Sequence, residues 1–412
     1  MQADLFLLLD KNVIIMHPAD DLRGIKSNKL SKKRIILAVT GSIAAVETIK
    51  LSRELIRHGA DVIPIMTKSA VKIIHPDALE FATSHKPIIE LSGKTEHVFY
   101  CGLVKDPVDL LLICPCTANT ISKIVHGIDD TTVTTFATTA IGSNIPIVIV
   151  PAMHLSMYKH KIVQQNIEKC KKLNIKFIDP NVHSNKAKMP NIDEIVATVL
   201  RETGKQDLTN KNILIIGGAT AEPIDDIRIL TNKSSGKTAV SLAKNAYFRG
   251  ANIELWYGHA NENVPSYIET KNYEKTKDII DLLNNNKKQF DIIIVCAAIA
   301  DYYPKKQKGK IPSGKNKLII ECSPAPKIIE KIKNKSPKSK IIAFKVEADK
   351  KDLKDKAEKF LKRNDINCVI ANTISAFGSN QNDIMIIPKK GKIIIKKDTK
   401  ENLSDYILNM IN

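Results

Sequence analysis

Short apolar runs alternate with longer amphipathic segments along most of the chain. The runs fall into two series, at residues 35–39, 62–66, 110–114 and 146–153, and at residues 213–217, 253–257, 291–301, 340–346 and 368–372. Runs of this length, separated by segments long enough for a helix, are typical of strands buried on both faces of a parallel sheet. The pattern therefore predicts an α/β protein with two doubly wound sheets.

Both series open in the same way. Residues 34–66 and 211–257 each run through an apolar strand, a glycine-bearing turn, a helix that stops at a Gly-Ala pair, and a second apolar strand. In the first series the helix is predicted to begin at Ser42 and to end at Gly59. A helix N-terminus after such a turn favours phosphate, because it presents free backbone N–H groups and a positive dipole end. Two such openings predict two anion-binding domains, although a glycine turn alone is a weak signal.

The two series also define the domain organisation. We expect a lead-in over residues 1–30 with Met16 as an alternative start, a first domain over 31–203, a linker over 204–210 and a second domain over 211–412. Helices are predicted over 191–202 and 349–363, and a terminal hairpin over 383–397 with its turn at Gly391.

The composition is that of a globular protein with an unusual charge. Of the 412 residues, 43% are hydrophobic and 26% are charged, and the formal net charge is +19. This charge leaves nucleic acid, an anionic membrane and acidic small substrates open as partners, and a solvated lysine-rich surface also accounts for it. The chain has no arginine-rich arm and no basic stripe interleaved with aromatic residues, which argues against nucleic acid.

Membrane spans, disulfides and metal sites are not expected. No apolar run approaches the roughly 20 residues of a membrane span. The basic leader and the small-residue cleavage site of a signal peptide are missing. The seven cysteines are odd in number, and the pair Cys114 and Cys116 lacks a second pair that would complete a zinc site. We therefore expect reduced thiols and a cytoplasmic location.

Four segments of the first domain are predicted to meet around one crevice. In an open parallel sheet, ligands bind beyond the carboxyl ends of the strands. The segments there are 40–45, 67–69, 114–120 and 151–154, and hydroxyls and small residues dominate them, which suits a phosphate joined to a flat ring. The GxGxxG pattern is absent, so NAD is not favoured. His97 is the titratable candidate, because an imidazole exchanges protons near neutral pH.

Residues 34–190 resemble the flavin-dependent cysteine decarboxylases. The resemblance rests on TGSIAA at 40–45, His97, PCTANTISKI at 115–124 and PAMHLSMY at 151–158. It implies a flavodoxin-like domain in which FMN oxidises the cysteine thiol so that CO₂ can leave, with His97 as the base that starts the reaction. The FMN contacts that it implies are Gly41, Ser42, Ile43, Ala44, Thr67, Pro115, Thr117, Ala118, Asn119 and Thr120.

The first domain departs from that family at two places. His154 stands where the family has an asparagine that grips the substrate carboxylate beside Met153. The flap, residues 183–189, lacks the cysteine that supplies a proton in the bacterial enzymes. We expect His154 to retain a catalytic role, and Lys188 of the flap to bind the substrate phosphate unless it is only a solvated lysine.

The second domain offers a different set of groups. Thr231 to Lys237 resembles a phosphate loop, but it lacks the first glycine of GxxxxGK[ST], so an ordinary P-loop ATPase is rejected. Asp301 is predicted at the carboxyl end of the 291–301 strand, where an acid is equally often a helix cap. The basic loop 310–315 is expected to close over phosphates.

Residues 210–412 resemble the phosphopantothenate–cysteine ligases, through TNKSSGK, AAIADY, AFKVEAD and IANTISAFGSNQND. The resemblance implies a Rossmann-like fold in which CTP is the co-substrate, Mg²⁺ offsets its charge, and Asn232 helps to form and stabilise an acyl-cytidylate. The nucleotide contacts that it implies are Ala297, Asp301, Lys310, Ala325, Pro326, Lys327, Ile328, Phe344, Lys359 and Arg363.

Both resemblances in one chain imply two steps of coenzyme A biosynthesis. The ligase half joins 4′-phosphopantothenate to cysteine, and the flavin half decarboxylates the product to 4′-phosphopantetheine. Such flavin halves usually assemble as trimers and such ligase halves as dimers, so a homo-oligomer without nucleic acid or membrane partners is expected. The alternative is an active ligase whose flavin half has lost catalysis and serves as a regulatory or scaffold subunit.

Overall fold

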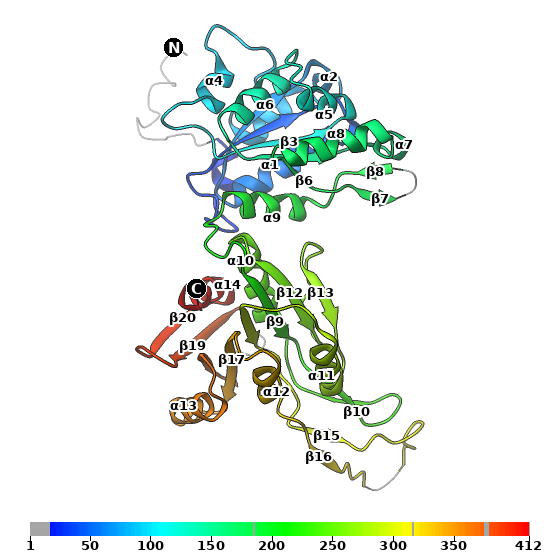
Figure 1. Cartoon of the computed structure of the whole chain (residues 1–412), viewed down its shortest axis with the longest axis vertical. Helices are drawn as coiled ribbons and strands as arrows, with labels where there is room; N and C mark the ends of the chain where they lie inside the picture. Colours follow the sequence, from blue (N-terminus) through cyan, green and yellow to red (C-terminus); the bar gives the residue numbers. More distant parts are fainter. Residues whose placement is uncertain (1–16, 184–185, 315–316, 375–378, 412) are drawn as a thin grey trace, which may run out of the picture. The chain divides into compact units, whose positions relative to one another are not determined.

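The structure, a computed structural model, describes residues 17–183, 186–314, 317–374 and 379–411. The chain divides into two compact units, residues 1–204 and residues 205–412 (Figure 1). None of the described helices is both long enough and apolar enough to cross a membrane. Met16 lies outside the described residues.

The first unit is a parallel sheet in the order β2-β1-β3-β4-β6, which is the strand order of flavodoxin. A small antiparallel sheet, β5-β8-β7, lies at its margin. The strands are β1 (Arg34–Val39), β2 (Asp61–Met66), β3 (Leu110–Cys116), β4 (Ile147–Pro151), β5 (Met153–His154), β6 (Lys176–Phe177), β7 (Asn181–His183) and β8 (Lys186–Lys188). The helices are η1 (Asp20–Leu22), η2 (Ile43–Glu47), α1 (Thr48–Arg57), α2 (Lys68–Val71), α3 (Pro76–Thr83), α4 (Glu96–Cys101), α5 (Ala118–Val125), α6 (Thr132–Gly142), α7 (Leu155–Tyr158), α8 (Lys161–Lys172) and α9 (Ile192–Thr203).

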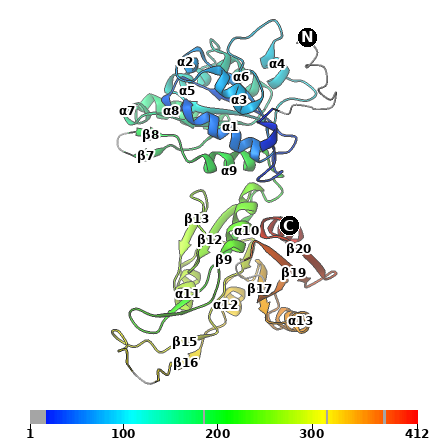
Figure 2. The ribbon, with the colours of Figure 1, turned by 180° about the vertical axis from the view of Figure 1, so that it is seen from behind.

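Helices cover both faces of this sheet, as the apolar runs predict. Alternate residues of β1, β2, β3 and β4 pack against α5, α6 and α8 in one buried cluster, while α1 and α9 lie on the other face (Figure 2). The helix predicted to begin at Ser42 starts instead as the 3₁₀ segment η2, and the α-helix proper begins at Thr48. The tighter first turn brings residues 42–47 to the edge of the sheet where the ligand crevice is expected.

The described part of the lead-in packs onto the first unit. Leu30 is fully buried, and the Arg23 guanidinium donates to the carbonyl of Ala60 (2.6 Å). Lys26 pairs with Glu54 on α1, and this ammonium together with Arg57 holds the pKa of the Glu54 carboxyl below its usual value despite burial. Residues 17–30 are therefore part of the folded unit.

The second unit is a sheet in the order β13-β12-β9-β14-β17-β18-β19-β20. The strands from β13 to β18 are parallel and follow the Rossmann order, and β19 and β20 add an antiparallel edge. The strands are β9 (Asn212–Gly217), β10 (Ala221–Pro223), β11 (Ile229–Thr231), β12 (Asn252–Tyr257), β13 (Glu269–Asn272), β14 (Ile292–Val295), β15 (Tyr302–Pro304), β16 (Cys322–Pro324), β17 (Lys340–Glu347), β18 (Cys368–Thr373), β19 (Gln381–Pro388) and β20 (Ile394–Thr399). The helices are α10 (Lys237–Phe248), α11 (Thr276–Asn285), α12 (Ile328–Lys335), α13 (Leu353–Asn364) and α14 (Lys400–Ile411).

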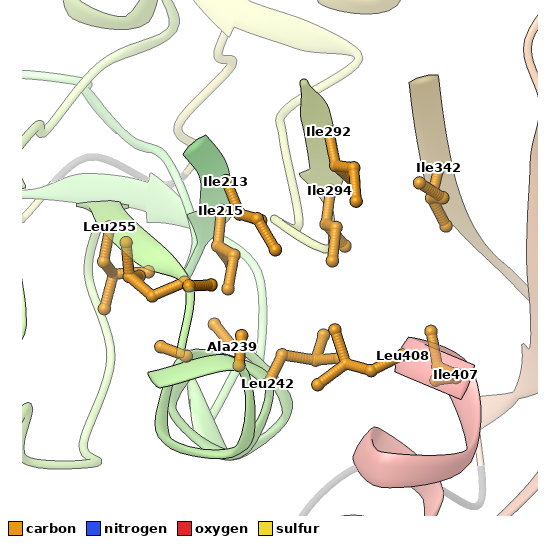
Figure 3. Packing of buried hydrophobic residues seen from close by; sticks show 14 of the residues in the cluster. Ile213, Ile215, Ala239, Leu242, Leu255, Ile292, Ile294, Ile342, Ile407 and Leu408 are labelled. Atoms are coloured by element: carbon orange, nitrogen blue, oxygen red, sulfur yellow. The ribbon is translucent and has the colours of Figure 1, made fainter. Parts of the chain in front are cut away.

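Two cores sandwich this second sheet. In one, Ile213, Ile215, Ile292 and Ile294 point toward Ala239 and Leu242 of α10 and toward Ile407 and Leu408 of α14 (Figure 3). In the other, the alternate residues of the same strands pack against α11, α12 and α13. The double burial explains why the strands read as continuous apolar runs.

Two sequence predictions for the second unit differ from the structure in detail, and one is confirmed. The run 291–301 is a strand only over β14, so Asp301 lies in the loop after it and not at its end. Residues 207 and 208, expected in a linker, pack onto the second unit: Leu208 is buried in its core, and Asp207 pairs with Arg249 (2.5 Å). The predicted terminal hairpin is present as β19 and β20, with Gly391 in the left-handed region between them (φ +115°).

Candidate active sites

In the first unit, the loops after β1, β2 and β3 meet at one edge of the sheet. A Cβ added at Gly41 would lie 2.6 Å from Cβ of Ser69, so only glycine allows the first loop to approach the second this closely. Thr40 Oγ1 donates to the carbonyl of Pro115 (2.8 Å), and Thr117 N donates to Thr40 Oγ1 (3.1 Å). The resulting cradle of backbone lies between β1 and β3, where a flavodoxin-like sheet binds FMN.

Two of the threonines predicted to contact FMN are helix caps. The amide of Ala70 donates to Thr67 Oγ1 (3.2 Å), and the amide of Thr120 donates to Thr117 Oγ1 (3.3 Å). Capping fixes these hydroxyls at the first turns of α2 and α5 and leaves the earlier N–H groups of those turns without helical partners. The loops thus present both hydroxyls and amides at the crevice.

A cavity of about 720 Å³ opens beside this cradle. It is bounded by η2, by β5 and by the flap strand β8. Six residues predicted at the site line it: Ser42, Ile43, Ala44, Met153, His154 and Lys188. Of the other described residues predicted here, Gly41, Thr67, Pro115, Thr117, Ala118, Asn119, Thr120 and His97 are not among its lining residues.

Hydrogen bonds at His154, a lining residue of the cavity, determine which of its ring nitrogens can donate. The amide of Ser156 donates to Nδ1 (3.3 Å), and Ser156 Oγ lies 2.7 Å from the same nitrogen. Because a backbone N–H can only donate, Nδ1 acts as the acceptor, so a neutral ring carries its proton on Nε2. His154 therefore offers a single N–H donor where the family has a carboxamide.

The flap is held against the cavity without a flap thiol. β8 pairs with β5 through Met153↔Ala187 and His154↔Lys186, and Cys114 Sγ lies 3.4 Å from Met189 Sδ.

All seven cysteines are described and free. Burial raises the pKa of the Cys101 thiol to about 12 and raises those of Cys114 and Cys116 well above their usual value, so these thiols stay protonated. The side chain of His183 and residues 184–185 lie outside the described part of the flap.

His97 lies on α4 and has an unsatisfied buried nitrogen. Its Nδ1 is one of three buried side-chain polar atoms without a hydrogen-bond partner among the described residues. Such an orphan is uncommon in a folded protein and is explained by a functional group or an unseen ligand. Three apolar side chains that follow His97 closely in sequence are exposed, namely Val98, Phe99 and Leu103, the last by 89%.

In the second unit, a cavity of about 330 Å³ gathers most of the predicted nucleotide contacts. Ala297, Asp301, Pro326, Lys327, Ile328, Phe344 and Arg363 line it. The β15–β16 pair joins the segments, because Tyr302 faces Pro324 and the amide of Ala325 donates to the carbonyl of Asp301 (2.8 Å). Lys327 Nζ pairs with Asp301 (2.7 Å) and Arg363 lies 3.7 Å from Glu330. Ala325, Lys310 and Lys359 are not among the lining residues.

A second, smaller cavity of about 90 Å³ lies at the N-terminus of α10, where the sequence predicts an anion site, but its lining residues Asn372 and Lys400 were not predicted. Gly236 begins the helix in the left-handed region (φ +77°), where a Cβ would fall 1.9 Å from Tyr257 Oη. Lys237 and Lys400 line the cavity, and burial followed by the charge of Lys237 lowers the pKa of Lys400. Asn372 also lines it, is only 7% exposed, and has an Oδ1 without a partner among the described residues.

The two cavities adjoin. Ala297 and Phe344 line both of them. Asn232 lies beside the smaller cavity: its Nδ2 donates to the carbonyl of Ala298 (3.0 Å), a residue of that cavity, although Asn232 is not among the lining residues of either one. Among the described residues no group of three or more His, Cys, Asp or Glu side chains is arranged to hold a metal ion.

Two family descriptions match the chain, one for each unit. Residues 23–204 match the family described as Flavoprotein, and residues 208–412 match the one described as DNA/pantothenate metabolism flavoprotein C-terminal domain. These matches agree with the flavodoxin-like and Rossmann-like sheets and confirm the predicted fold class.

Full-length relatives carry both parts. The chain is 43% identical to the coenzyme A biosynthesis bifunctional protein CoaBC of Thermococcus kodakarensis over 96% of this chain and 100% of the relative. It is 39% identical to the protein of the same name in Methanocaldococcus jannaschii, over 96% of this chain and 98% of the relative. A crystal structure of the C-terminal domain of a CoaBC protein is 29% identical and covers 50% of this chain and 96% of that domain, with a TM-score of 0.42. The chain therefore belongs to the family of coenzyme A biosynthesis bifunctional proteins CoaBC, and it is an enzyme with a phosphopantothenate–cysteine ligase half and a phosphopantothenoylcysteine decarboxylase half.

Proposed function

We propose that the second unit joins 4′-phosphopantothenate to cysteine at the expense of CTP, and that the first unit decarboxylates the product to 4′-phosphopantetheine with FMN. The observation that carries the ligase half is the pair of adjoining cavities, with Asn232 hydrogen-bonded to Ala298 at the wall of the smaller one. The nucleotide occupies the larger cavity. The phosphate of phosphopantothenate occupies the smaller one, where α10 offers its free N–H groups beside Lys237 and Lys400.

The ligase step is nucleotidyl transfer at the junction of the cavities. The pantothenate carboxylate attacks the α-phosphorus of CTP, pyrophosphate leaves, and the cysteine amine then attacks the acyl-cytidylate. Lys327, Arg363 and the exposed Lys310 neutralise the triphosphate, and Mg²⁺ accompanies it. The second amide hydrogen of Asn232 is directed to the oxygen on which charge develops.

The ligase half will release pyrophosphate at least about ten times faster with CTP than with ATP, GTP or UTP. The reason is that the AAIADY segment, Lys310 and Phe344 resemble the CTP-using ligases, and that Ala297, Asp301 and Phe344 line the nucleotide cavity. Pyrophosphate release measured side by side with the four nucleotides, each with Mg²⁺, phosphopantothenate and cysteine, tests this. Reactions with a chelator are the control, and equal or faster turnover with ATP contradicts the preference.

The flavin fits the first unit on two observations. Gly41 leaves room for a close backbone approach that a Cβ would close, and the Nδ1 of His97 is buried without a partner. When bound there, FMN supplies the two-electron oxidation of the substrate thiol. Ser42, Thr67 and the loop 115–120 hold it, His97 removes the thiol proton, and His154 donates Nε2–H to the substrate carboxylate.

We propose that a second copy of the chain completes each flavin site. His97 does not line the cavity that contains His154, and the apolar side chains around it, Phe99 and Leu103 among them, are exposed. A trimer of flavin units buries such a surface and brings His97 to a neighbour's cavity. In the ligase unit Ile227, Leu230, Tyr302 and Ile319 are also exposed, and a dimer covers them. We further propose a cytoplasmic location, in keeping with the free thiols.

The enzyme will complete the reduction of its decarboxylated intermediate without a flap thiol. His154 stands at the cavity wall with an Nε2–H, and Lys188 lines the same cavity, so proton donors other than cysteine are present. The measurement is the mass of the product after one turnover of 4′-phosphopantothenoylcysteine.

A product two mass units lighter than phosphopantetheine, the enethiol, contradicts this and favours the alternative of a flavin half without full catalysis. The His154→Asn variant separates the two roles of that residue. Loss of reduction identifies His154 as the proton donor, whereas complete phosphopantetheine limits it to binding the carboxylate.

A further inference from the structure

Lys310 lies between two residues whose amides are tied to a pair of aspartates. The amide of Gly309 donates to Asp226 Oδ2 (2.8 Å), and the amide of Ile311 donates to Asp225 Oδ2 (3.0 Å). Lys310 itself is exposed. Its backbone is thus held on both sides, and its ammonium group extends into solvent from a fixed point.

Asp225 is the buried half of this pair. Its carboxylate accepts from the amides of Ile227 (2.8 Å) and Arg228 (2.6 Å) in addition to Ile311, and the Arg228 guanidinium donates to it (2.6 Å). These bonds, that of Ile311 first, hold the pKa of the Asp225 carboxyl well below its usual range. Arg228 also donates to the carbonyl of Ile311 (3.3 Å), so both polar backbone atoms of Ile311 are bound.

Asp226 is the exposed half. Its own amide donates to the carbonyl of Gly309 (3.3 Å), which makes the contact with Gly309 reciprocal. Its carboxylate also pairs with Lys306 (2.7 Å), and the amide of Gln307 donates to the carbonyl of Ile224 (2.9 Å). Residues 306, 307, 309 and 311 are therefore each joined to residues 224–228.

We propose that Asp225, Asp226 and Arg228 are positioning residues for the ligase reaction, which hold Lys310 where its ammonium meets the nucleotide phosphates. This inference rests on the proposed role of Lys310. An exposed lysine on a free loop loses both backbone and side-chain freedom when it binds an anion, and a backbone fixed beforehand removes the backbone part of that cost. A second feature agrees with this function: the carboxylates face the amides beside Lys310, so they hold the backbone without neutralising the ammonium.

The Asp226→Ala variant of the full chain tests the proposal. We expect the KM for CTP to rise about tenfold, the effect of losing one hydrogen bond to a charged group. The KM values for phosphopantothenate and cysteine will stay unchanged, and so will the Tm, because the Asp226 side chain is 49% exposed. Asp226→Asn keeps an oxygen that accepts from Gly309 and should stay near the wild type. Lys306→Ala removes only the ion pair and is the matched control.

The decisive comparison uses Lys310→Ala alone and together with Asp226→Ala. If Asp226 acts through Lys310, the double variant has the same KM for CTP as Lys310→Ala. If the increases in the KM for CTP caused by the two single substitutions multiply in the double variant, the positioning role is overturned, and the proposed ligase function stays intact. A Lys310→Ala enzyme with wild-type kinetics would overturn the positioning role together with that of Lys310, whereas the absence of ligation by the wild-type chain would contradict the proposed function itself.

Discussion

Replacing His97 with asparagine will abolish the release of CO₂ from 4′-phosphopantothenoylcysteine while flavin stays bound. The expected loss is about 10²- to 10⁴-fold, the usual contribution of a positioned general base. Flavin should remain because the cradle around Gly41, Ser69 and Thr117 does not include α4. The measurements are CO₂ release and the flavin absorbance of the purified variant.

The ligase half provides an internal control for this variant. Asn232 and its two cavities lie in the other compact unit, so pyrophosphate release should match the wild type. Normal decarboxylation by His97→Asn would make the histidine structural.

Mixing inactive subunits then tests how the site is assembled. A His97→Asn chain and a chain whose cavity is blocked by Ser42→Trp are each expected to be inactive. If one subunit supplies His97 and its neighbour supplies the cavity, mixed oligomers contain sites in which both parts are intact, so part of the activity returns. Mixtures that stay inactive although mass measurements detect mixed oligomers contradict a shared site.

The elements that the sequence predicts well are those buried on both faces. A strand such as β3 has no polar face, so its apolar run is visible without knowledge of its neighbours. Helix starts are harder to predict. Ser42 has the right chemistry for a helix start, yet it opens a 3₁₀ segment, because the choice between hydrogen-bond patterns over one turn depends on packing that local sequence does not record.

The two cavities of the second unit differ in how far apart their lining residues lie in the sequence. The nucleotide cavity is lined largely by residues that are close together in sequence, such as Ala297 with Asp301, and Pro326 with Lys327 and Ile328. The cavity at α10 combines Gly236 and Lys237 with Asn372 and Lys400, which come from β18 and α14. Four residues of TNKSSGK mark this cavity in the sequence: Ser234, Ser235, Gly236 and Lys237. The departure of TNKSSGK from the P-loop pattern argues against an ATPase, but it does not argue against the binding of phosphate at the N-terminus of α10.

His97 and Lys310 show a further limit of sequence reasoning. Both are predicted site residues, and neither lines a cavity together with its predicted partners. His97 has an orphan nitrogen and exposed apolar neighbours, which agree with a site shared between subunits. Lys310 is exposed on an anchored backbone, so its side chain has to reach a bound nucleotide. A single sequence records the residue types at such places but not the partner that completes them.

The Asn232→Ala variant will bind CTP but lose about 10²- to 10³-fold in ligation, as expected when one donor to a developing negative charge is removed. Its Nδ2 already donates one hydrogen to the carbonyl of Ala298 at the wall of the smaller cavity, and we expect the other hydrogen to reach the reacting carboxylate. Binding of CTP should persist because Lys327, Arg363 and Phe344, not Asn232, line the nucleotide cavity.

Exchange of labelled pyrophosphate into CTP, with phosphopantothenate but without cysteine, isolates the first half-reaction. Wild-type enzyme will exchange the label, since formation of the acyl-cytidylate is reversible, and Asn232→Ala will not. Lys233→Ala changes the exposed neighbour and should leave exchange intact. Asn232→Asp keeps a side chain of the same shape but replaces the donor with a carboxylate, so it should be as impaired as alanine if the N–H is what the reaction needs. Full exchange by Asn232→Ala would exclude the residue from formation of the acyl-cytidylate, and full ligation would remove it from the mechanism.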